Sequence, residues 1–259
     1  MTTPICIPTI HRQNAALTLS SFTMREGLGP VCIVTREEER QFWLKQRDVD
    51  EVIVPQRSGI AFARQAVIDW AIDAGHEKVL MLDDDLYFYT RYKEGSTDLR
   101  KSLPGEISNA LLVLSSALDT YAHVTMGPRQ FQQAKPNPAY ENVRANNVHG
   151  YRPQVLREHG IRFADMECME DYHVTLSLME CGFPNYGYWG VVWNQKQSGG
   201  AGGCSTYRDA AMQERSAKRL EALHPKTVKA VIKRSETGRG AMGTRWDVSV
   251  RWKDALVKR

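Results

Sequence analysis

The sequence predicts an α/β protein whose mostly parallel central sheet is flanked by helices and followed by a basic C-terminal extension. Short apolar runs alternate with helical stretches over the first ninety residues, which is typical of a parallel sheet covered on both faces. Residues 79–82 are apolar without interruption, as in a strand buried on both faces. Residues 218–259 contain twelve Lys or Arg and four Asp or Glu, which sets them apart from the rest.

Strands are expected where apolar runs occur, at 5–10, 30–34, 52–54, 79–82, 122–126 and 188–193. Helices are expected between them, near 14–25 and at 37–46, 59–74, 102–118, 168–181 and 210–223, with a short one ending near Gly160. Gly75 and Gly182 each follow one of these helices, and glycine commonly ends a helix. Residues 130–144, rich in Gln, Asn and Pro, and the glycine-rich residues 198–203 are expected to form loops.

The chain has 259 residues, of which 42% are hydrophobic, and this is enough to bury a substantial core. We expect one domain over 1–217 and a basic helix or tail over 218–259 that packs on the same domain. Within a total net charge of +4, residues 218–259 carry +8 and the rest carry −4. Such a segment is typical either of a solvated helix or of a surface that contacts a polyanion.

The sequence predicts a cytoplasmic protein with no membrane segment. No run approaches the roughly 18 apolar residues that a membrane span needs, and the N-terminus lacks the basic start of a secretory signal. The five cysteines are an odd number without the spacing of a zinc site. We therefore expect reduced, structural cysteines.

The strongest functional signal is the triplet Asp83, Asp84 and Asp85, which begins at the first residue after the expected strand 79–82. Ligands of parallel sheets bind beyond the carboxyl ends of the strands. A nucleotide diphosphate needs a divalent cation, and Mg²⁺ or Mn²⁺ prefers carboxylate ligands. A second Asp-x-Asp pair, Asp48 and Asp50, falls in a loop, so position rather than pattern favours the triplet as a metal site.

Glu170 and Asp171 open the helix expected at 168–181. Carboxylates in a first helical turn favour the helix dipole, which is the purely structural interpretation. The functional interpretation is that one of them takes a proton from an acceptor hydroxyl.

In this order, these features resemble the GT-A glycosyltransferases from about residue 4 to residue 210. The resemblance implies a GT-A-like, Rossmann-like sheet and a nucleotide-sugar donor. Asp83 and Asp85 would contact Mn²⁺ or Mg²⁺ or the ribose, with Asp84 also near the donor. Asp171, with Glu170 as the second choice, would be the base. Further donor contacts are expected from Pro8, Thr9, Arg57 and Arg64.

Two further features bear on the donor. Many relatives use a later histidine as a third metal ligand, and His149 or His173 would take that place. The glycine loop, including Gly199 and Gly200, is either a flexible linker or a lid whose backbone, with Tyr207 or Arg208 nearby, contacts the phosphates.

The segments 83–87 and 169–171 also resemble the phage TET-associated glycosyltransferases. That resemblance implies a hexosyltransferase that moves a sugar from a UDP-sugar to 5-hydroxymethylpyrimidine, such as 5-hydroxymethylcytosine, in bacteriophage DNA within the host cytoplasm. The base would need to leave the duplex before attack. DNA contacts are expected from Lys226, Lys229, Lys233, Arg234, Arg239, Arg245, Trp246 and Arg251, with Trp252 and Lys253 nearby.

Three alternatives stay open. The same body would serve a glycan, lipid or protein acceptor. A nucleotidyltransferase would need a glycine-rich loop after the first strand, and residues 8–12 contain no glycine. A non-enzymatic nucleic-acid-binding protein would leave the acidic triplet unexplained.

Overall fold

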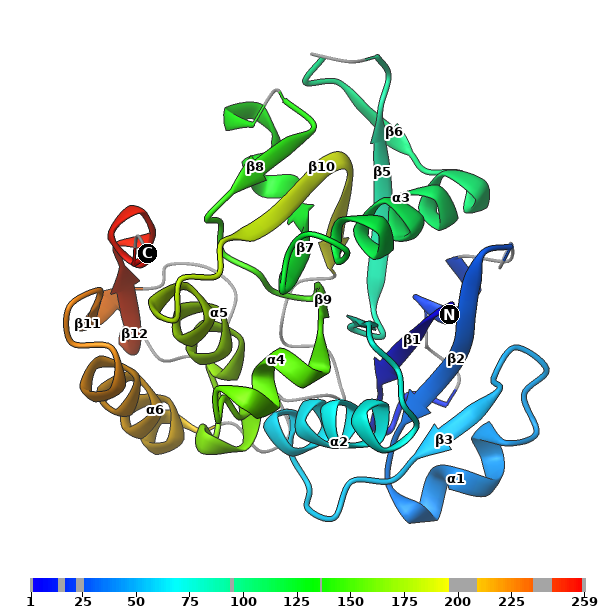
Figure 1. The fold of residues 1–259 in the computed structure, drawn as a ribbon, viewed down its shortest axis with the longest axis horizontal. Helices are drawn as coiled ribbons and strands as arrows, with labels where there is room; N and C mark the ends of the chain where they lie inside the picture. Colours follow the sequence, from blue (N-terminus) through cyan, green and yellow to red (C-terminus); the bar gives the residue numbers. More distant parts are fainter. Residues whose placement is uncertain are drawn as a thin grey trace.

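The computed structural model describes residues 2–13, 17–21, 26–93, 96–135, 137–195, 209–234 and 244–257. Their centre is a ten-stranded sheet of order β3-β2-β1-β4-β9-β7-β10-β5-β6, with β8 added beside β10 (Figure 1). The strands are β1 Thr3–Pro8, β2 Leu28–Val34, β3 Glu51–Ile53, β4 Val79–Leu82, β5 Leu86–Arg91, β6 Leu99–Lys101, β7 His123–Pro128, β8 Ala139–Glu141, β9 Val148–Tyr151 and β10 Asn185–Gln195. The helices are α1 Glu37–Trp43, α2 Ile60–Asp73, α3 Pro104–Ala117, α4 Pro153–Glu158, α5 Glu170–Glu180 and α6 Ala210–Leu223.

Strands β3, β2, β1 and β4 run parallel, as the alternation of strands and helices predicts. Side chains of β1 point alternately to two cores, with Ile5 and Ile7 packed on the α3 side and Cys6 on the α2 side. Each face of the sheet is therefore covered by helices, and the apolar runs of these strands are buried on both faces (Figure 1). The α/β class with a large helix-covered sheet is confirmed.

The middle of the sheet depends on β9, a strand that the sequence did not predict. It lies antiparallel between β4 and β7, so that His149 is the partner of Met81 on one side and of Thr125 on the other. β7 and β10 then pair in parallel, and β5, β6 and β8 add antiparallel strands. The sheet is therefore parallel on the side of β1 and mixed on the side of β10.

Helix ends follow the glycine signals. Gly75 after α2 and Gly182 after α5 have φ of 75° and 83°, a region that glycine enters without steric cost. The expected helix near 14–25 is described only at 17–21, where it is a 3₁₀ turn, Leu19–Ser21. The expected loop at 130–144 contains another 3₁₀ turn, Arg129–Ala134, and the short strand β8.

The C-terminal segment forms a hairpin where a basic helix or tail was expected. Strands β11 Val228–Arg234 and β12 Thr244–Val250 pair antiparallel, and a 3₁₀ turn, Trp252–Asp254, follows. Val228 and Val248 are buried against α5 and α6 in a third apolar core. The expected boundary at residues 217 and 218 falls inside α6, and the segment packs on the helix that begins at Glu170 (Figure 1).

No helix in the described ranges is long and apolar enough to cross a membrane.

Candidate functional site

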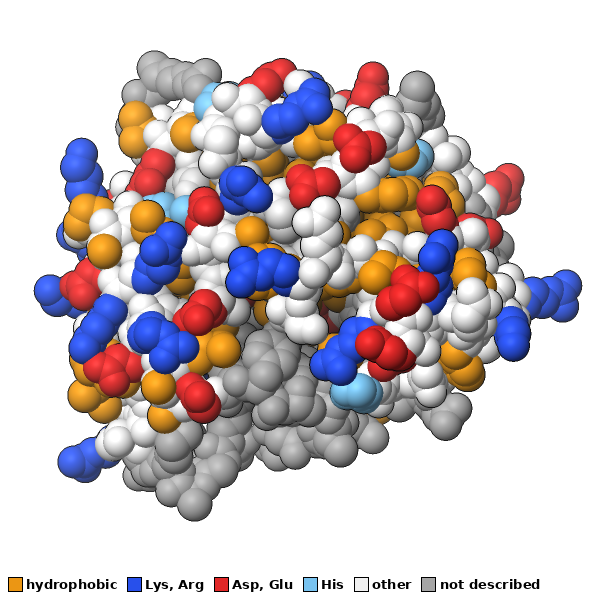
Figure 2. Space-filling view, turned by 90° about the horizontal axis from the view of Figure 1, so that it is seen from below, with side chains coloured by type: hydrophobic (Ala, Val, Ile, Leu, Met, Phe, Trp, Pro, Cys, Tyr) orange, Lys and Arg blue, Asp and Glu red, His pale blue; other side chains and the backbone are white. Residues whose placement is uncertain are grey.

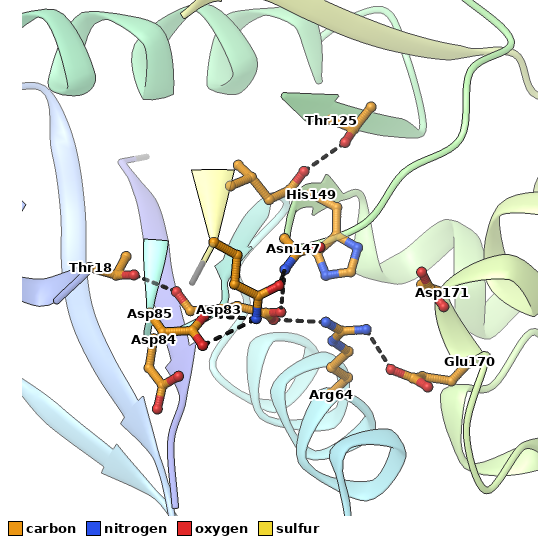
Figure 3. Close-up of polar contacts among 12 residues, drawn as sticks. Thr18, Arg64, Asp83, Asp84, Asp85, Thr125, Asn147, His149, Glu170 and Asp171 are labelled. Carbon is orange, nitrogen blue, oxygen red and sulfur yellow. Dashed lines mark hydrogen bonds and ion pairs between the residues drawn. The ribbon is translucent and has the colours of Figure 1, made fainter. Parts of the chain in front are cut away.

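The triplet Asp83, Asp84 and Asp85 follows β4 directly, at the carboxyl end of the parallel strands (Figure 3). The Asp83 N–H donates to the Asn147 carbonyl over 2.8 Å, and the Thr18 hydroxyl donates to the Asp83 carbonyl over 2.5 Å. The turn between β4 and β5 is therefore held by two separate loops. Its carboxylates lie at the sheet edge where ligands of such folds bind.

The Asp83 carboxylate is bound on both oxygens. Arg64 Nη2 donates to Oδ1 over 2.9 Å, and Asn147 Nδ2 donates to Oδ2 over 2.9 Å. Arg64 comes from α2 and Asn147 from the residue before β9. Asp83 therefore connects the end of β4 to a helix on one side and to the neighbouring strand on the other.

Asp84 and Asp85 share one guanidinium nitrogen. Arg12 Nη1 lies 2.6 Å from Asp84 Oδ1 and 2.7 Å from Asp85 Oδ2. Thr9 Oγ1 donates to Asp84 Oδ2 over 2.6 Å, and Gln195 Nε2 contacts both oxygens of Asp85 at 2.9 and 3.1 Å. A positive group thus already lies between these two carboxylates.

Burial raises the pKa of Asp83 to about 6, although the Arg64 charge acts in the opposite direction. Burial also raises the pKa of Asp84 to about 6, against the hydrogen bond from Thr9. The cause is the cost of removing a carboxylate from water, and neighbouring carboxylates add to it. The Arg64 and Arg12 charges beside these carboxylates therefore favour their ionised forms against the effect of burial.

Arg64 also binds the second acidic motif. Its Nη1 donates to Glu170 Oε1 over 2.5 Å, while Nη2 holds Asp83 (Figure 3). The side chains of Arg64 and Glu170 are 5% and 4% exposed, so this ion pair is shielded from solvent. One guanidinium therefore joins the end of β4 to the start of α5, which are far apart in the sequence.

Asp171 is held much less tightly. Its side chain is 13% exposed, and Arg144 Nη2 lies 3.9 Å from its Oδ2, beyond hydrogen-bond distance. Of the two predicted base candidates, Glu170 is engaged by a buried cation and Asp171 is the more accessible carboxylate.

His149 lies fully buried on β9, with its ring on the side of Arg64 in Figure 3. Its Nδ1 is 3.2 Å from the Tyr151 hydroxyl, and no described residue hydrogen-bonds its Nε2. Burial and the nearby Arg64 charge lower the pKa of His149 well below its usual value, so the ring is neutral. The other predicted histidine, His173, pairs with His224 over 3.0 Å and belongs to the contact between α5 and α6.

Three non-glycine residues with left-handed backbone lie next to these groups. His11, Asn147 and Met169 have φ of 57°, 59° and 63°. His11 precedes Arg12, Asn147 binds Asp83, and Met169 precedes Glu170. Such conformations are uncommon for residues with a Cβ and concentrate at functional sites.

The described residues contain no group of three His, Cys, Asp or Glu side chains close enough to hold a metal ion. The chemistry of the donor set nevertheless fits a cation. Five carboxylates gather here with three guanidinium groups, namely Asp83, Asp84, Asp85, Glu170 and Asp171 with Arg12, Arg64 and Arg144. The local excess of negative charge, and the Arg12 nitrogen that Asp84 and Asp85 share, show that these carboxylates take a cation as their partner.

The other predicted donor contacts fall into three groups. Pro8 and Thr9 end β1 beside the triplet, and Thr9 contacts it through Asp84. Arg57 is exposed and stacks over the Phe62 ring at 4.5 Å, so the structure does not bring it to the triplet. Four predicted contacts lie outside the described residues: Gly199, Gly200, Tyr207 and Arg208.

Four of the eight predicted DNA-contact residues form ion pairs within the C-terminal segment. The pairs are Lys229 with Glu221, Lys233 and Arg245 with Asp247, and Arg251 with Asp254. Trp246 packs into the third core, and Trp252 stacks on Tyr172 with ring centroids 5.8 Å apart. The Lys226 carbonyl accepts a hydrogen bond from Arg251, Arg234 ends β11, and Arg239 lies outside the described residues. Figure 2 shows Lys and Arg side chains interspersed with Asp and Glu on the face that it presents.

Sequence reasoning missed four residues that bind the triplet, namely Arg12, Thr18, Asn147 and Gln195. Arg12 carried a usable signal, because it follows the strand whose end was already expected at the donor. Thr18 and Gln195 carried none. Asn147 carried a weak one, since asparagine tolerates the left-handed backbone that precedes β9.

The fold resembles that of S. aureus TarS, residues 1–349, with a TM-score of 0.51, 14% identity, and coverage of 85% of this chain and 66% of that one. A mannose-1-phosphate geranyltransferase from Thermus thermophilus gives a TM-score of 0.48 at 13% identity, covering 74% of this chain and 75% of that one. No curated protein matches the sequence.

A family model described as TET-Associated Glycosyltransferase matches residues 3–203. The match covers β1 to β10, the acidic triplet and the start of α5, and it ends before α6. It identifies an enzyme that transfers sugars, and it disfavours both the nucleotidyltransferase and the non-enzymatic alternatives. The chain belongs to the TET-associated glycosyltransferase family.

Proposed function

We propose that the enzyme transfers a sugar from a nucleotide-sugar, with a UDP-sugar as the first donor to test, to the hydroxyl of 5-hydroxymethylpyrimidine in DNA. The observation that carries the proposal is that Arg64 pairs with both Asp83 and Glu170. These two ion pairs bring the carboxylates after β4 and those at the start of α5 to one place. A donor diphosphate and an acceptor hydroxyl need such groups side by side. The DNA acceptor rests on the family description and on the basic C-terminal segment.

Asp171 is proposed as the base. It takes the proton of the acceptor hydroxyl as the oxygen forms a bond to the anomeric carbon, and the bond from that carbon to the diphosphate breaks. The nucleoside diphosphate leaves with the electron pair. Glu170 does not compete for this role, because Arg64 holds it as a buried carboxylate.

Asp85 and Asp84 are proposed as the residues that would hold a divalent ion, with Asp83 as a further contact to the ion or the ribose. A bound ion supplies positive charge for the leaving diphosphate. Arg12, which contacts both carboxylates, is a further cation at this edge of the sheet. The family resemblance suggests His149 as a third metal ligand. Its buried ring lies on the side of Arg64, so we propose instead that it lines the site as a neutral polar side chain.

The test uses the full chain with several UDP-sugars, Mn²⁺ or Mg²⁺, and either hydroxymethylated or plain DNA, followed by digestion and mass measurement of the nucleosides. The proposal expects a hexose mass on hydroxymethylpyrimidine only. Asp83→Asn with Asp85→Asn is expected to abolish turnover while DNA binding persists. Full activity of the double variant would contradict the role of the triplet. Transfer to a glycan, lipid or protein, with none to DNA, would contradict the acceptor alone.

A further inference from the structure

Arg144 combines a fixed guanidinium with hydrogen-bond donors that no described residue uses. It lies between β8 and β9, and its Cζ is 4.2 Å from the centre of the Tyr172 ring. Its side chain is 39% exposed. Among the described residues, none accepts a hydrogen bond from it, and its buried Nε has no partner. A guanidinium presents five N–H donors in a rigid fork that matches carboxylate and phosphate oxygens.

The position of Arg144 is set by aromatic packing. Tyr172 is mostly buried, and the same ring stacks on Trp252, with ring centroids 5.8 Å apart and planes 24° apart. Stacking of this kind attracts a cation without using its N–H groups. The guanidinium is therefore held in place while its donors stay unused by the part of the chain that the structure describes.

Arg144 also lies beside the proposed base. Its Nη2 is 3.9 Å from Asp171 Oδ2, near enough for attraction but too long for a hydrogen bond. The cations that neutralise the strand-end carboxylates are Arg12 and Arg64, and neither of them contacts Tyr172 among the described residues. Arg144 is therefore the cation that the structure places beside Asp171, apart from the cations paired with the acidic triplet.

The basic residues of β11 and β12 make a useful contrast. Lys229, Lys233 and Arg245 already face carboxylates at 3.1 to 3.2 Å within their own segment. To bind a phosphate they must give up or share these partners. Arg144 has no hydrogen bond to give up among the described residues, so it is the better receptor for an anion next to Asp171.

We propose that Arg144 binds an anionic group of the acceptor, namely a phosphodiester oxygen of the polynucleotide next to the hydroxyl that Asp171 deprotonates. The site consists of Arg144 on the Tyr172 ring, supported by Trp252 from the C-terminal segment. This segment lies beyond residues 3–203, the part that the family model matches. The inference rests on the proposed function, and it identifies how the acceptor backbone is oriented.

The test compares wild type with Arg144→Gln and Arg144→Lys, and uses Arg157→Gln on the exposed surface of α4 as the matched control. Two measurements are made on each protein. The first is binding of a fluorescent single-stranded oligonucleotide carrying 5-hydroxymethylcytosine, across a salt series. The second is transfer to that oligonucleotide and to the free hydroxymethylated nucleoside, which has no phosphate.

Arg144→Gln is expected to weaken oligonucleotide binding about 10-fold or more. The slope of log affinity against log salt concentration should become shallower by about one. Its loss of transfer should be at least about tenfold larger on the oligonucleotide than on the nucleoside. Arg144→Lys should recover part of the binding, and Arg157→Gln should match wild type. Unchanged oligonucleotide affinity, or equal losses on both acceptors, overturns the proposal for Arg144.

The two proposals fail separately. If the wild type transfers no sugar to any acceptor, the proposed function fails, while the binding series still decides the role of Arg144. If transfer proceeds and Arg144→Gln binds the oligonucleotide as wild type does, only the inference about Arg144 is wrong. Circular dichroism of each variant separates a binding defect from unfolding.

Discussion

The charges around Arg64 and the charges of the β11–β12 hairpin are arranged in opposite ways. Arg64 binds Asp83 and Glu170, residues far from it in the chain, and the Arg64–Glu170 pair is buried. In the hairpin, Lys233 and Arg245 both meet Asp247, and these contacts are local and partly exposed. Losing one partner of a buried ion pair leaves an uncompensated charge, whereas exposed pairs contribute little. The first region should be sensitive to single substitutions and the second tolerant of them.

The largest effect is expected from Arg64→Met. It leaves Glu170 and Asp83 without their shared cation, and the free energy of unfolding should fall by about 3–5 kcal/mol. Urea denaturation measures this change. Adding Glu170→Gln should recover part of the loss, because the buried charge disappears. A double variant no more stable than Arg64→Met would refute the importance of the ion pair.

A large loss of rate without a loss of stability is expected from Asp171→Asn. General base catalysis is worth about 10²–10⁴-fold, and Asp171 makes no close ion pair that holds the fold together among the described residues. Steady-state kinetics with saturating donor should therefore show a lower kcat while the denaturation midpoint stays near wild type. Should Glu170→Gln lose the same rate and no stability, the two carboxylates have been assigned the wrong way round.

A smaller effect concerns pH and the buried His123. Burial lowers the pKa of His123 to about 4, while its Nδ1 donates to the Gly150 carbonyl. The folded protein keeps this ring neutral, whereas the unfolded chain takes up a proton below about pH 6.5. Stability present above pH 6.5 is therefore lost as the pH falls toward 4, by on the order of 2–3 kcal/mol.

Urea denaturation at pH 7 and pH 4.5 checks this. His123→Gln cannot take up the proton, so its stability should change less between the two pH values. The partly exposed His76 gives the control, and His76→Gln should keep the wild-type difference. An identical pH dependence in His123→Gln and wild type would show that another group is responsible.

The smallest effect is expected in the hairpin. Lys233→Gln with Arg245→Gln should change stability by less than about 1 kcal/mol and reduce the salt slope of DNA binding slightly. Removing 226–259 would be a poor substitute, because Val228 and Val248 are buried against α5 and α6. A loss of several kcal/mol in the double variant would mean that these exposed pairs support the fold after all.

The sequence predicted the parts of the fold that have local signals. The strands 79–82 and 5–10 carry long apolar runs, and the predicted triplet does lie at a strand end. Val148–Tyr151 contains a histidine and a glycine in four residues, so no apolar run marked it as the central strand β9. The hairpin was missed for a different reason. Residues 228–232 contain four apolar residues, three of them β-branched, which is a strand signal, and the high charge of the segment obscured it.

The sequence predicted several residues of the site but not which of them contact one another. Asp83 and Glu170 were both named, but the residue that joins them was expected at the donor alone. Contacts between residues so far apart depend on strand order, and strand order required β9. For the same reason Arg144 attracted no attention, since its value lies in Tyr172 and Asp171, which no local pattern connects to it.

The place of β9 in the sheet also has a consequence for the newly made chain. Until Val148–Tyr151 leave the ribosome, β4 has an open edge and Asp83 lacks Asn147. The aspartates are synthesised long before the strand that completes their surroundings, and Glu170 follows later still. A nascent chain therefore carries an unfinished acidic edge, and ribosome-bound chains with residues 148–151 inside or outside the exit tunnel should differ sharply in their resistance to protease.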